Sequence, residues 1–151
     1  MNRARQLRQV TAIVVICSAM SLLFHSACGT SEVLPVDIAK DELCARCKSM
    51  IAEKQYAAEF ITKDGFVRKF DDLSCMIQHA ERVKRDSIAV FYAVDYASQH
   101  WIKAEEARFV RSDKFKTPRD GGILAFEDHS QAKALSTQFN AELLAFSDIL
   151  K

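Results

Sequence analysis

The stretch that organises this chain is residues 41–50, with the sequence DELCARCKSM. Cys44 and Cys47 stand three positions apart, a spacing that lets both sulfurs turn to one side of a tight turn, where they can share an ion or form a disulfide. Met50 follows three residues later and offers a thioether, a soft and uncharged ligand. Thiolates together with thioethers select Cu(I) over harder cations. This stretch therefore predicts a soft-metal site, with a disulfide as the alternative.

A second stretch of the same kind lies at residues 70–76, FDDLSCM, where Cys75 is followed directly by Met76. Either aspartate of this stretch can cap a helix that reaches about Arg85. Cys75 lies off the apolar stripe of that helix, in its first turn, where backbone N–H groups favour a thiolate while the carboxylates of Asp71 and Asp72 oppose it. Met76 lies on the stripe, so core packing is its alternative role. We expect the two stretches to meet and to supply the candidate ligands Cys44, Cys47, Cys75, Met50 and Met76.

Two other functions remain open for the same cysteines. The Cys44–Cys47 pair is also typical of a thiol-disulfide redox protein, although Leu43 replaces the aromatic residue expected there and no βαβ pattern surrounds the pair. Three cysteines with His79 could instead form a zinc site that stabilises an interaction module. The chain has no Gly-rich phosphate loop, no Ser/His/Asp order and no His-Glu-x-x-His motif. We therefore do not expect an enzyme.

The N-terminal residues 1–27 are predicted to be an export signal. Three arginines within the first eight residues precede an uncharged run over residues 10–24, which is short for a membrane-spanning helix of about 20 residues. The run ends at Ser-Ala before Cys28, which looks like a bacterial lipobox; an ordinary secretory signal is the alternative. We expect a diacylglyceryl and palmitate anchor on Cys28, a tether over residues 28–36 and a domain over 37–151. The protein would then face the periplasm, at the inner or the outer membrane.

Composition narrows the class of protein further. The chain has 151 residues and a formal net charge of +1, with no clustered basic face that would indicate nucleic-acid binding. Its 5 cysteines include Cys17 in the predicted signal and Cys28 at the predicted lipidation site. The three that remain are an odd number, whereas a purely structural disulfide set in an exported protein would be even.

The pattern of apolar residues predicts a single small α+β domain with a largely antiparallel sheet and two to three packing helices. Asp64-Gly65 lies between two strand-like runs and is a strong hairpin signal. Further expected elements are a strand over 87–96, a short helix within 101–110, a strand over 123–126, and a last helix from Asp128 or Ser130 to Leu150.

The sequence resembles the NosL family, the accessory lipoproteins of nitrous oxide reductase assembly. The resemblance runs through nearly the whole domain in blocks of matching order and spacing: CARC at 44–47, YAAE at 56–59, FDDLSCM at 70–76, VDY at 94–96, WIKA at 101–104, TP at 117–118 and GILAF at 122–126. It implies a membrane-anchored Cu(I) chaperone that hands copper to the apo form of nitrous oxide reductase or a related copper enzyme. The implied partners are this enzyme and the machinery that matures it.

The family pattern carries over to the thiols better than to the thioethers. Cys44, Cys47 and Cys75 match the family's thiol positions. The family commonly has a methionine two residues after the second cysteine, where this chain has Ser49, and Met50 is displaced by one position. The family's Pro-Met loop reads Pro118-Arg119 here. The resemblance therefore implies a thiol-rich site in which one thioether ligand is displaced and another is missing.

Overall fold

The computed structural model describes residues 32–150. Val33–Lys151 form one compact unit, and the predicted signal, Cys28 and the first part of the tether lie outside the described residues. Within this described part of the chain, no helix is long and apolar enough to cross a membrane.

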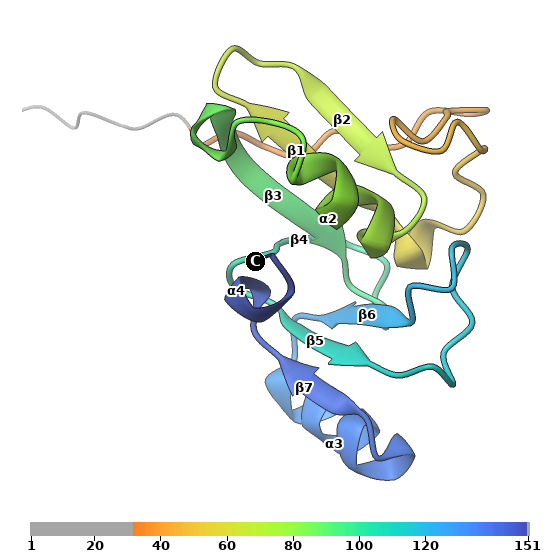
Figure 1. Ribbon diagram of the computed structural model, residues 1–151. Coiled ribbons are helices and arrows are strands. Elements are labelled where there is room, and N and C mark those ends of the chain that lie inside the picture. The colour runs from red at the N-terminus through yellow and green to blue at the C-terminus, as the bar shows by residue number, and fades with distance from the viewer. Residues whose placement is uncertain (1–31, 151) are drawn as a thin grey trace, which may run out of the picture. The chain divides into compact units, whose positions relative to one another are not determined.

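The first half of the domain is an antiparallel four-stranded sheet in the order β2-β1-β3-β4 (Figure 1). Its strands are β1 (Ala58–Thr62), β2 (Val67–Phe70), β3 (Ile88–Val94) and β4 (Trp101–Lys103). The predicted hairpin is confirmed: β1 and β2 pair antiparallel, and Gly65 in their turn has φ +87°, which suits a residue without a Cβ. Central β1 and β3 carry the apolar residues that build the core.

The second half is an antiparallel three-stranded sheet in the order β6-β5-β7. Its strands are β5 (Arg108–Arg111), β6 (Ile123–Phe126) and β7 (Glu142–Leu144). Helix α3 (His129–Phe139) packs on this sheet (Figure 1), and the side chain of Asp128 caps its first turn. The two sheets are joined through a parallel bridge between Asp95 and Ala125. All strand pairs within the two sheets are antiparallel and helices pack on both sheets, so the α+β class with a largely antiparallel arrangement is confirmed.

Helix α2 (Leu73–Ala80) follows β2 directly and packs on β1 and β2. Its residues Leu73, Met76 and Ala80 are buried, so one face covers the sheet while the helix start faces the loop that carries Cys44 and Cys47. Short helical turns complete the fold: η2 (Lys54–Tyr56), η3 (Arg85–Ser87) and α4 (Phe146–Ile149).

Three of the expected helices are corrected by the structure. The helix expected to reach about Arg85 ends at Ala80. The segment 101–110 contains no helix but the strands β4 and β5, because Trp101 and Ile102 pair with β3 and Phe109 pairs with β6. The last expected helix ends at Phe139 instead of Leu150, because Asn140 adopts a left-handed conformation with φ 51° that stops the helix. The residues beyond it form β7 and α4.

A buried carboxyl lies where the N-terminal segment meets the first sheet. Glu59 is fully buried on β1, and its Oε1 accepts a hydrogen bond of 2.9 Å from the Val36 backbone N–H. Its Oε2 has no hydrogen-bond partner among the described residues. Burial raises the pKa of Glu59 to about 7 against the attraction of Lys69, and the charges of Glu42 and Asp37 add to the rise. Folding therefore favours the protonated form of this side chain.

The contribution of Glu59 to the stability of the wild type is expected to fall as pH rises from about 4.5 to about 7, because the folded carboxyl holds its proton up to about 7 while the unfolded one releases it near 4.5. In Glu59→Gln this loss disappears, so the unfolding free energy of the variant relative to wild type should increase by about 2–3 kcal/mol over that range. Urea unfolding at several pH values measures it, with exposed Glu127→Gln as the control. A difference that does not change with pH would contradict the assignment.

Candidate metal centre

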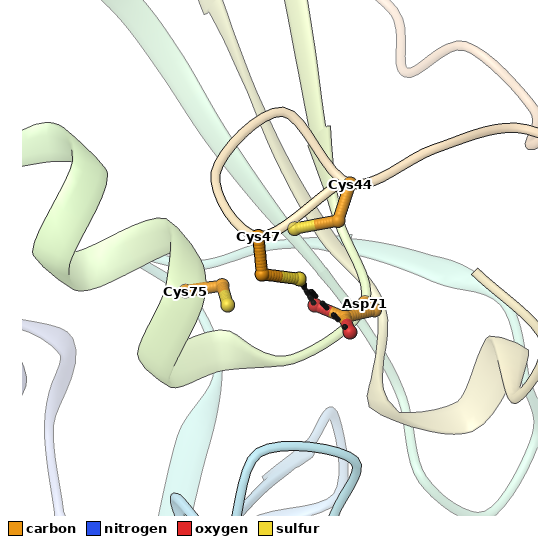
Figure 2. Close-up of side chains that lie close together, drawn as sticks. All are labelled: Cys44, Cys47, Asp71 and Cys75. Carbon is orange, nitrogen blue, oxygen red and sulfur yellow. Dashed lines mark hydrogen bonds between the residues drawn. The ribbon is translucent and has the colours of Figure 1, made fainter. Parts of the chain in front are cut away.

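Three thiols and one carboxylate converge at the start of helix α2. Cys44, Cys47, Cys75 and Asp71 each place one ligand atom within 4.8 Å of the other three (Figure 2). Two of the thiols come from the loop before η2, the carboxylate follows β2, and Cys75 lies in the first turn of α2. The two cysteine stretches therefore do meet in the fold, as the sequence predicts. All three thiols are free.

The loop that carries Cys44 and Cys47 is shaped by its own backbone hydrogen bonds. Leu43 and Met50 form an isolated antiparallel bridge, and inside it the Cys44 N–H donates to the Ser49 carbonyl at 2.8 Å. The Lys48 N–H donates to the Cys44 carbonyl at 3.1 Å, and Lys48 has φ 65°, which closes the turn. This is the tight turn that the Cys-x-x-Cys spacing predicts.

The adjacent aspartates Asp71 and Asp72 have different roles. Asp72 is the N-cap of α2, and its Oδ1 accepts from the Ser74 N–H at 2.7 Å. Asp71 turns the other way, so that both of its oxygens lie 3.4 Å from the Sγ of Cys47. Sequence reasoning missed Asp71 as a member of the cluster. The signal that could have found it is the repeated aspartate, because a helix start needs only one cap.

Two arginines flank the cluster. Arg119 lies on the loop between β5 and β6, and its Nε donates to the Oδ2 of Asp71 at 3.0 Å, while its Nη2 donates to the Oγ of Ser49. Its backbone N–H donates to the Oδ2 of Asp72 at 3.0 Å. The Nη1 of Arg46 lies 4.0 Å from the Sγ of Cys75. Two guanidinium groups thus contact the cluster, one at its carboxylate and one at a thiol.

The pKa values of the three thiols are shifted in different directions. Burial raises the pKa of Cys75 far above its ordinary value, and the negative charges of Cys44, Asp71 and Cys47 raise it further. Burial also raises the pKa of Cys44, despite backbone N–H groups that favour its thiolate. For Cys47 the hydrogen bonds from the Ser49 backbone and from Cys44 outweigh burial, and the pKa is lowered. Cys47 is also the least buried of the three, so it is the thiol that ionises most readily.

The charge of Asp71 is fixed by its contacts. Burial acts to raise the pKa of this carboxyl, but the hydrogen bonds from Cys44, Arg119 and Cys47 outweigh it, and the pKa is lowered. The same contact with Asp71 raises the pKa of the Arg119 guanidinium, and the charge of Cys47 adds to this. Asp71 and Arg119 are therefore an ion pair at the edge of the cluster.

The other candidate ligands lie in different surroundings. Met76 is fully buried in the core, and Met50 is 54% exposed opposite Leu43. That these thioethers bind the metal stays a prediction. His79 packs against the rings of Phe60 and Phe70, at centroid distances of 5.8 and 5.3 Å, and the compact group of ligand atoms consists of the three thiols and Asp71.

The domain is a small α+β fold in which three thiols and a carboxylate converge on one point. This arrangement is typical of proteins that bind a thiophilic metal ion. Comparison with protein families identifies it further: the NosL family model matches residues 35–151. The chain belongs to the NosL family.

The fold is also that of a known structure. The chain is similar to the crystal structure of the copper chaperone NosL from Shewanella denitrificans, with 20% sequence identity and a TM-score of 0.69. The match covers 76% of this chain and 93% of that one. Comparison with curated proteins gave no match.

Proposed function

We propose that this protein binds one Cu(I) ion through Cys44, Cys47 and Cys75 and delivers it to a copper enzyme. The observation that carries the proposal is the convergence of three free thiols from two segments on one point. Thiolates are soft ligands that suit Cu(I), whereas Ca²⁺ and Mg²⁺ require sets of oxygen ligands. The related structure that is described as a copper chaperone supports the same reading.

The exposure of the thiols supports transfer of the ion instead of permanent storage. Cys44 and Cys75 are buried, while Cys47 is only partly covered by the protein. A thiolate, thioether or imidazole of a partner could therefore approach the ion from the side of Cys47 and replace the protein's ligands one by one. We place the partner among copper enzymes and their maturation machinery, with nitrous oxide reductase as the first candidate because of the family membership.

Titration of the reduced protein with Cu(I) against a chromophoric chelator tests the proposed function. We expect one tightly bound Cu(I), and an affinity that falls as pH is lowered from about 8 to about 5, because protons compete for the thiols. Native mass spectrometry of the same samples identifies the ion. Bound zinc in place of copper would favour a zinc-stabilised module, and a metal-free Cys44–Cys47 pair that cycles with thioredoxin would favour a redox protein.

We also propose that Cys28 carries a lipid that anchors the domain to a membrane on its periplasmic side. The Ser-Ala-Cys sequence after an uncharged run supports this. In cells given labelled palmitate, the wild type should incorporate the label and fractionate with membranes, and Cys28→Ala should remain an unlabelled precursor. Cys17→Ala serves as the control, because this cysteine lies within the uncharged run. Equal amounts of wild type and Cys28→Ala in the soluble periplasm would contradict the anchor.

A further inference from the structure

The contacts of Arg119 at the metal centre point to a role in metal selectivity. Its side chain joins two segments that each contribute to the site, through the carboxylate of Asp71 and the hydroxyl of Ser49. We propose that Arg119 is a positioning residue that withholds Asp71 from the metal, so that the centre offers three thiolates to Cu(I) and disfavours Zn²⁺. This inference rests on the proposed function.

Asp71 has the position of a fourth ligand. Its side chain is 3% exposed, and one of its oxygens lies within 4.8 Å of all three sulfurs. With this oxygen included, the centre has three sulfur ligands and one oxygen ligand. Structural zinc sites are almost always four-coordinate and tetrahedral, and they accept carboxylate oxygen as well as thiolate. The donors for a zinc site are thus all present among the described residues.

Arg119 is the group that opposes this use of Asp71. Its Nε donates to Oδ2 at 3.0 Å, and a charge-assisted bond between a guanidinium and a buried carboxylate is one of the stronger hydrogen bonds in proteins. To give a metal its full donor strength, Asp71 would have to share or lose this partner. The positive charge of Arg119 also disfavours Zn²⁺, because it repels a divalent ion twice as strongly as a monovalent ion at the same place.

The position of Arg119 does not depend on its own side chain. Its backbone N–H is held by Asp72 at 3.0 Å. Two residues on, Gly121 packs so closely on the start of α2 that a Cβ there would lie 2.6 Å from the Cβ of Ser74. Since the loop is fixed at these two points, replacing the partly exposed Arg119 side chain is expected to leave the fold intact.

The test compares wild type with Arg119→Met, Arg119→Lys and the double variant Arg119→Met with Asp71→Asn. Affinities for Cu(I) and for Zn²⁺ are measured by competition on the reduced full-length protein, and Co²⁺ absorption reports tetrahedral coordination. Because Arg119→Met frees the carboxylate of Asp71 as a fourth ligand and removes a positive charge beside the site, it should raise the ratio of Zn²⁺ to Cu(I) affinity by about tenfold or more. Arg119→Lys should show a smaller rise, since it keeps the charge without the planar guanidinium. The double variant should return to the wild-type ratio.

The outcomes separate this inference from the proposed function. If the wild type binds Cu(I) and the ratio in Arg119→Met is unchanged, or both affinities fall in parallel, the role of Arg119 in selectivity is wrong while Cu(I) binding stands. A selective fall in Zn²⁺ affinity would overturn it as well, because Arg119 would then be orienting Asp71 as a ligand. If the wild type has no affinity for Cu(I), both proposals fail.

Discussion

The Cys47→Ser variant is expected to lose Cu(I) affinity by at least about 100-fold, which is the largest effect that we expect of any single substitution in this chain. Removal of an outer-shell partner alone costs about 10- to 100-fold in metal affinity, and the loss of a ligand should exceed that. Cys47 is also the thiol with the lowered pKa, so it supplies the thiolate that is most readily formed. A serine hydroxyl at the same place is a hard and weakly acidic ligand that Cu(I) does not prefer.

Competition with a chromophoric Cu(I) chelator measures the loss. Ala45→Ser is the matched control, since it adds a hydroxyl to the same turn and leaves the three thiols in place. Thermal unfolding without metal shows whether the variant is folded, which we expect because Cys47 is partly exposed. Cys75→Ser should also weaken binding. Wild-type affinity in both cysteine variants would mean that copper binds elsewhere or not at all.

The Asp72→Ala variant is expected to lower the unfolding free energy by about 2–4 kcal/mol. The loss of an N-cap accounts for about 1 kcal/mol. The second part arises because Asp72 is 1% exposed and also accepts the backbone N–H of Arg119, so its removal leaves a donor without its partner at a cost of about 1–3 kcal/mol. The same carboxylate thus caps α2 and fixes the loop that carries Arg119.

Asp128→Ala is the matched control for this prediction. Asp128 caps α3 in the same way, with its Oδ1 accepting from the Ser130 N–H at 2.7 Å, but it is exposed. Its replacement should cost only about 1 kcal/mol. The two variants are compared through the midpoint of urea unfolding at an unchanged slope. Equal losses would show that Asp72 is a simple cap and does not support the Arg119 loop.

Some expected elements were right because neighbouring residues decide them. The hairpin of β1 and β2 needs only a turn that glycine favours and two runs of strand-forming residues. The start of α2 needs a capping aspartate. The expected helices at 101–110 and after Phe139 were wrong, because apolar residues at helical spacing also fit short strands when a partner strand is present. Phe109 of β5 pairs with Leu144 of β7. The two residues are 35 positions apart, and no local sequence pattern predicts a pairing over that separation.

The sequence by itself determined that Cys44, Cys47 and Cys75 are the chemically informative residues, because thiol chemistry and Cys-x-x-Cys spacing are local properties. Only the tertiary structure decided what surrounds them. Asp71 joins the thiols because β2 ends where its carboxylate meets Cys47. Arg119 reaches Asp71 from 48 positions away, and a hydrogen bond is a matter of a few ångströms in space. The types of ligand can therefore be identified from the sequence. Their geometry and the charged groups around them depend on long-range packing.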